Sequence, residues 1–92
     1  MLRGYGHQVG TDLDDPLELS EMTICTADPA LVRAVGEFLL QAADRLERDG
    51  EAFGHDHFRD VRRDVWRPEF VDVIVERMEP PAPFRPLPSP DQ

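Results

Sequence analysis

The sequence predicts a small α+β domain in which one amphipathic helix packs on a three-stranded, mostly antiparallel sheet, in the order β-α-β-β. Two patterns carry this prediction. Apolar residues recur every three or four positions between residues 31 and 48, as they do on one face of a helix. Apolar and polar residues alternate before that segment and again after residue 70, as they do in strands.

The first strand is expected over residues 17–26. Apolar residues alternate with polar ones from residue 17, but the phase slips by one position before Met22 and Ile24. A β-bulge would absorb that slip, so both side chains are expected to face the core. Cys25 is the single cysteine, and we expect it to be a small core residue.

The helix is expected over residues 31–48. Asp28 can cap its first turn, Pro29 suits the first helical position, and Gly50 supplies the stop. The apolar face predicted for the core consists of Leu31, Val35, Phe38, Leu39, Ala42 and Leu46.

Two further strands are expected, over residues 53–61 and 70–78, and we expect them to pair antiparallel. In the later strand, Val71, Val73 and Val75 form one face and are expected to lie under the helix. The connection between the two strands is polar and rich in arginine.

The composition divides the chain into three parts. Residues 1–16 are rich in glycine and aspartate and are expected to be a flexible segment. Residues 17–79 form the single predicted domain, and residues 80–92 are expected to be a disordered, proline-rich tail. Because so short a domain has little core, we expect a homodimer, formed through an edge strand or the open face of the sheet.

The chain is acidic, with 19 aspartate and glutamate residues against 10 basic ones and a formal net charge of −9. Phosphate backbones and anionic membrane surfaces repel such a protein, so we expect neither nucleic acid nor membrane as a partner. No secretory signal or membrane-spanning stretch is evident, and the cysteine content suits a reducing compartment, so we expect a cytoplasmic protein. The expected partner is a neutral or basic protein.

His55 and His57 are the candidate residues for chemistry. On a strand they lie on the same face, where they could share a metal ion or act as an acid/base pair. Two ligands alone make a weak metal site, and Asp60 falls on the opposite face. We therefore expect no metal, no cofactor and no catalysis, and we keep a small metal-binding or acid/base enzyme as the alternative.

Trp66 lies within a charged connection, where a tryptophan either folds back to cap the core or anchors an interface. The neighbouring acidic residues either form a solvated, ion-paired surface or dock a basic partner. If Trp66 anchors an interface and the acidic residues dock a basic partner, the residues that contact the partner are Asp56, His57, Asp64 and Trp66.

The helical run 31–43, the sequence Gly-His-Asp-His-Phe at residues 54–58 and the aliphatic strand 71–75 occur in an order that resembles a family of small bacterial immunity proteins from polymorphic-toxin systems. The resemblance covers residues 17–79. It implies that the protein neutralises a cognate toxin by stoichiometric binding, without chemistry. An acidic surface agrees with this expectation, because it would steer capture of a basic toxin.

Overall fold

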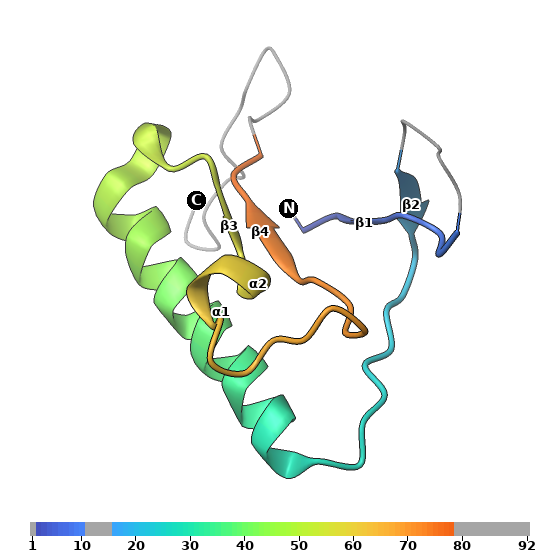
Figure 1. The fold of residues 1–92 in the computed structure, drawn as a ribbon. Helices are drawn as coiled ribbons and strands as arrows, with labels where there is room; N and C mark the ends of the chain where they lie inside the picture. The colour runs from blue at the N-terminus through green and yellow to red at the C-terminus, as the bar shows by residue number, and fades with distance from the viewer. Residues whose placement is uncertain (1, 11–15, 79–92) are drawn as a thin grey trace, which may run out of the picture.

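The computed structural model describes residues 2–10 and 16–78 and has an α+β architecture, which confirms the predicted fold class (Figure 1). One long helix lies against a compact unit built from the following part of the chain. The strands form two separate antiparallel pairs. The elements are β1 (Gly4–Gly6), β2 (Leu17–Leu19), α1 (Pro29–Asp49), the 3-10 helix η1 (Gly50–Ala52), β3 (His55–His57), α2 (Phe58–Val61) and β4 (Ile74–Glu76). The proline-rich segment 80–92 lies outside the described residues.

Helix α1 begins and ends where the sequence indicates. The Asp28 carboxylate accepts a hydrogen bond of 2.9 Å from the N–H of Ala30, and Pro29 occupies the first turn. Gly50 ends the helix with a φ of 54°, a conformation that favours glycine. Within the described part of the chain, no helix combines the length and the apolar content needed to cross a membrane.

The antiparallel pairing expected of the two later strands is confirmed. β3 pairs with β4, with His57 opposite Ile74 and His55 opposite Glu76. The pairing is shorter than the sequence suggests, because the backbone turns into α2 directly after β3.

The first predicted strand is not part of this sheet, so the expected three-stranded sheet is wrong. Its beginning forms β2, which pairs instead with β1, a segment expected to be flexible (Figure 1). The glycines of β1 explain the pairing. Leu19 leans across Gly6, and a Cβ added to that glycine would lie 3.3 Å from the leucine side chain.

Residues 20–27 form neither strand nor helix, and their side chains are exposed. Met22 and Ile24 therefore do not face the core, and Cys25 is an exposed free thiol, contrary to expectation. This stretch connects β2 to the start of α1 without pairing with another strand, so its alternating pattern has no sheet to bury against.

The core lies between α1 and the unit that follows it. Its fully or nearly fully buried side chains are Ala34, Phe38, Ala42, Phe53 and Phe58. Partly buried side chains pack around this core, namely Val35, Val65, Trp66, Val73 and Val75. The expectation that Leu39 and Val71 lie in the core is wrong. Leu39 is 44% exposed and Val71 is 75% exposed, because the packed face of α1 centres on the 34–38–42 row and the chain is still irregular at residue 71.

Candidate functional site

A connected set of polar contacts surrounds His57, at the junction of β3 and α2. Its Nδ1 atom lies 2.6 Å from Oδ2 of Asp72, and the N–H of Arg59 donates a 2.8 Å hydrogen bond to the other oxygen of the same carboxylate. The N–H of Phe58 donates to the carbonyl of Val73 at 2.8 Å. These three bonds tie the turn after β3 to the chain that precedes β4.

Asp72 is ionised at neutral pH. Burial acts to raise the pKa of its carboxyl, but the hydrogen bonds from His57 and from the N–H of Arg59 outweigh burial and hold that pKa below its usual value. A carboxylate only accepts hydrogen bonds, so the short contact assigns the ring proton of neutral His57 to Nδ1. The Nε2 atom of His57 is then the ring nitrogen left as a hydrogen-bond acceptor.

His55 stands beside this pair. The rings of His55 and His57 meet edge to face with their centroids 5.0 Å apart, and His55 is exposed. Because side chains alternate along a strand, Asp56 lies on the other face, where its carboxylate contacts Arg45 of α1 at 2.5 Å. The two histidines therefore share the sheet face that points away from the helix.

The histidine pair lacks a third ligand in the described chain. Across residues 2–10 and 16–78, no group of three or more histidine, cysteine, aspartate or glutamate side chains is placed to hold a metal ion. A metal ion on His55 and His57 would need a ligand from outside these residues.

Trp66 folds back onto the core, which is the first of the two roles that the sequence leaves open. Its ring packs against the core cluster, and its Nε1–H donates a 3.1 Å hydrogen bond to the carbonyl of Val71. The guanidinium carbon of Arg59 lies over the ring, 6.0 Å from its centroid. Since the backbone of Arg59 also holds Asp72, contacts run without a break from His57 to Trp66.

The other two predicted contact residues take part in ion pairs elsewhere. Asp56 is half-buried and holds β3 against α1 through Arg45. Asp64 is exposed and forms a two-pronged ion pair with Arg62, at 3.1 and 3.2 Å, while Arg62 also reaches Glu37 of α1 at 2.9 Å. The four predicted residues therefore do not form a single cluster, and only His57 and Trp66 belong to the connected surface.

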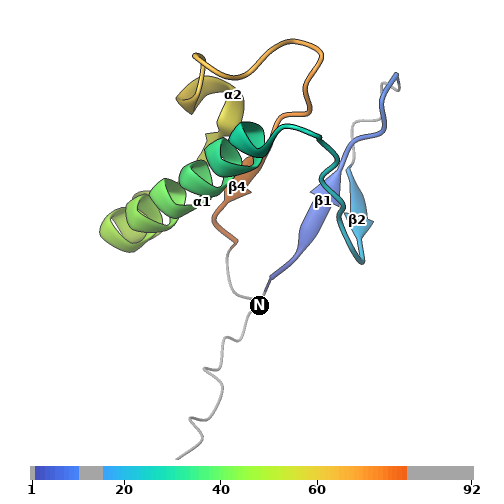
Figure 2. The same cartoon turned by 90° about the horizontal axis from the view of Figure 1, so that it is seen from below.

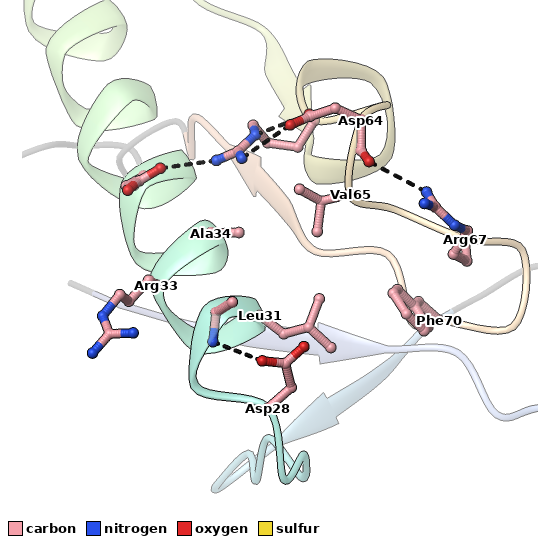
Figure 3. A pocket seen from close by; sticks show the side chains of 11 residues that line it. Asp28, Leu31, Arg33, Ala34, Asp64, Val65, Arg67 and Phe70 are labelled. Carbon is pink, nitrogen blue, oxygen red and sulfur yellow. Dashed lines mark hydrogen bonds and ion pairs between the residues drawn. The ribbon is translucent and has the colours of Figure 1, made fainter.

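A shallow hollow of about 540 Å³ lies between the first half of α1 and the loop after α2 (Figure 3). Leu31, Ala34, Val65 and Phe70 supply its apolar lining. Among its polar lining residues, Arg62 forms ion pairs with both Glu37 and Asp64. The hollow is built from chain segments far apart in sequence, and neither His55 nor His57 lines it.

Sequence reasoning missed Asp72 and Arg59, the two residues that connect His57 to Trp66. The signal for Asp72 was present, since it is a lone carboxylate in an aliphatic strand. Once the two later strands are paired antiparallel, a residue just before β4 falls next to the end of β3. The contact of Arg59 with Trp66 depends on the turn of α2, which the expected strand over residues 53–61 did not include.

Comparison of this chain with protein-family models, with curated proteins and with solved structures finds no match in any of the three. The resemblance to small immunity proteins therefore stays a prediction.

Proposed function

We propose that this protein is a non-catalytic binding protein of the cytoplasm, and that it acts as an immunity-type antidote to a basic bacterial toxin domain. The observation that supports this most is the connected surface from His57 to Trp66. Contacts within the chain already orient its side chains, through Asp72 and Arg59. Binding through such a surface loses little side-chain freedom, which favours affinity.

Each predicted contact residue has its own part in this proposal. Trp66 is the anchor, because a tryptophan held at one edge by the core can bury its remaining ring surface against a partner. His57 offers Nε2 as a hydrogen-bonding group. Asp64 is exposed and helps to steer a basic partner, whereas Asp56 supports β3 from behind.

The shape of the region and the charge of the whole chain support a macromolecular partner. The histidines share the sheet face that points away from α1, and the hollow of Figure 3 is lined by other residues. Small substrates are usually bound in concave pockets, whereas protein partners use broader surfaces. The net charge of −9 speeds encounters with a basic domain and slows encounters with acidic ones.

The test is protection of cells that express the product of a neighbouring gene as the candidate toxin. Wild-type protein should protect and should bind the purified toxin domain in a one-to-one complex. His57→Ala should weaken binding at least about tenfold, as loss of an interface contact. Trp66→Phe, which keeps a ring against the core, should weaken it less, and Glu69→Gln, an exposed change outside the surface, should leave it unaltered.

Two results would count against the proposal. If wild-type protein protects, but His57→Ala and Trp66→Phe bind the toxin domain as tightly as wild type does, the contact surface lies elsewhere. If wild-type protein neither protects against nor binds any neighbouring gene product, the antidote function is wrong.

A metal-binding or acid/base enzyme is the alternative, and the observation in its favour is the pair of histidine rings 5.0 Å apart on one face. The Asp72 carboxylate would orient His57, as acid/base catalysis requires. A zinc titration of the wild type and of His55→Ala/His57→Ala distinguishes the metal-dependent form of this alternative from the binding protein.

A further inference from the structure

Helix α1 carries a second apolar face that the described chain leaves uncovered. Ala34, Phe38 and Ala42 point into the core, and Figure 2 shows α2 and β4 on that side of the helix. The uncovered side, here called the outer face, consists of Val32, Gly36, Leu39, Leu40 and Ala43. A helix that covers one core needs an apolar stripe about 100° wide, and α1 is apolar over more than that.

Exposure confirms that the outer face is open. Leu40 is 70% exposed and Val32 is 55% exposed, although both belong to the longest and best-formed element. Gly36 lies between them in a shallow apolar hollow, and a Cβ added there would meet nothing within 4 Å. Nothing in the described chain therefore requires glycine at this position, although glycine weakens a helix relative to alanine.

Two residues of opposite charge border the outer face and are equally spaced about Leu40. Arg33 lies as far before Leu40 as Glu47 lies after it. Both are exposed, and within the described residues neither side chain takes part in a hydrogen bond or an ion pair. If a second α1 ran antiparallel across a two-fold axis at Leu40, each Arg33 would meet Glu47 of the other helix, and the two Leu40 side chains would meet at the centre.

From this complementarity we infer that a second copy of the chain covers the outer face, and that the two α1 helices pack antiparallel about Leu40. The packing buries the apolar residues of both outer faces. It also forms two ion pairs between the helices, each joining Arg33 of one copy to Glu47 of the other. It differs from the sequence-based expectation, which placed a homodimer at an edge strand or the sheet face. It also goes beyond the proposed toxin binding and does not rest on it.

Sedimentation equilibrium of the full chain, up to high micromolar concentration, measures this association. The wild type should be a dimer, and Leu40→Asp should raise its dissociation constant at least about tenfold. Since Leu40 is mostly exposed, circular dichroism of the variant should stay that of a folded protein. Leu17→Asp is the matched control, because this leucine of β2 is also exposed and lies off the outer face.

A charge exchange tests the antiparallel register. Arg33→Glu and Glu47→Arg should each weaken the dimer, because each places like charges together, and the double variant should restore it. Arg63→Glu and Glu69→Arg make the same changes in net charge at exposed loop positions and should leave the dimer unaltered.

Three outcomes would overturn the inference. A wild-type monomer at high micromolar concentration would show that no second copy covers the face. A dimer insensitive to Leu40→Asp would place the contact elsewhere, and sensitivity to Leu17→Asp instead would point to the β1–β2 pair. Failure of the double variant to recover would rule out the antiparallel register about Leu40.

Discussion

Phe38 of α1 and Phe58 of α2 meet edge to face, with ring centroids 5.6 Å apart and an interplanar angle of 63°. This contact lies between two ion pairs that also join the helix to the chain after it. Glu37 of α1 forms an ion pair with Arg62. About two turns later along α1, Arg45 forms an ion pair with Asp56. Helix α1 is therefore held near its middle by the aromatic pair and the adjacent ion pair of Glu37. The ion pair of Arg45 holds it again about two turns later.

Phe38→Ala should lower the free energy of unfolding by about 3–5 kcal/mol, because the side chain is 0% exposed and its loss leaves a cavity beside Phe58. At concentrations low enough to dissociate the inferred dimer, Leu39→Ala should cost less than about 1 kcal/mol, because 44% of this side chain is exposed in the single chain. Urea unfolding followed by the fluorescence of Trp66, the single tryptophan, measures both values. Equal losses would mean that the packed face of α1 is assigned wrongly.

Asp56→Asn should destabilise the fold by about 1–3 kcal/mol, because it removes the charge opposite a partly buried arginine. The Nη2 atom of Arg45 is already buried without a hydrogen bond in the described structure, so little else compensates the guanidinium. Asp49→Asn is the matched control, since its pair with Arg48 is exposed to solvent and should contribute less to stability. Thermal unfolding of the two variants at neutral pH compares them, and a larger loss for the control would contradict the structural role of Asp56.

Asp72→Asn should make stability less sensitive to acid. Burial acts to raise the pKa of Asp72, but hydrogen bonds from His57 and Arg59 hold it below the ordinary value of 3.8. The unfolded chain titrates near that ordinary value. The ionised carboxylate therefore stabilises the fold at higher pH, and this contribution is lost as the pH falls from about 4 through the lowered pKa.

Acid unfolding of wild type and Asp72→Asn below about pH 4 measures this difference. The control is Asp64→Asn. The hydrogen bond from Arg62 lowers the pKa of Asp64 as well, but this group is exposed, so its effect should be smaller and should fade with added salt. Parallel acid curves for wild type and Asp72→Asn would show that the contact with His57 contributes nothing to the fold.

Zinc should bind to the histidine pair more weakly than about micromolar, because two surface ligands without a third do not hold the ion tightly. Calorimetric titration of the wild type and of His55→Ala/His57→Ala tests this expectation. His7→Ala is the control, as it removes a histidine outside the pair. Stoichiometric binding tighter than micromolar that is lost only in the double variant would favour the metal-dependent enzyme over the binding protein.

The sequence predicts the helix and the later strand pair well because both depend on local signals. Asp28, Pro29 and Gly50 act on the backbone within a few residues of themselves, and they set the ends of α1 as expected. The alternating pattern near the end of the domain likewise predicts β4 and its antiparallel neighbour. The two histidines share a face, as the two-residue period of a strand requires.

By itself, then, the sequence determined the α+β class, the limits of α1 and the common face of His55 and His57. The tertiary structure decided which half of a broadly apolar helix is buried, since both Phe38 and Leu39 satisfy a helical period and only packing against Phe58 separates them. It also paired β2 with β1 and joined Asp72 to His57. Such contacts depend on which segments, distant in sequence, meet in the fold. Burial of apolar surface over the whole chain decides this, and no local sequence pattern encodes it.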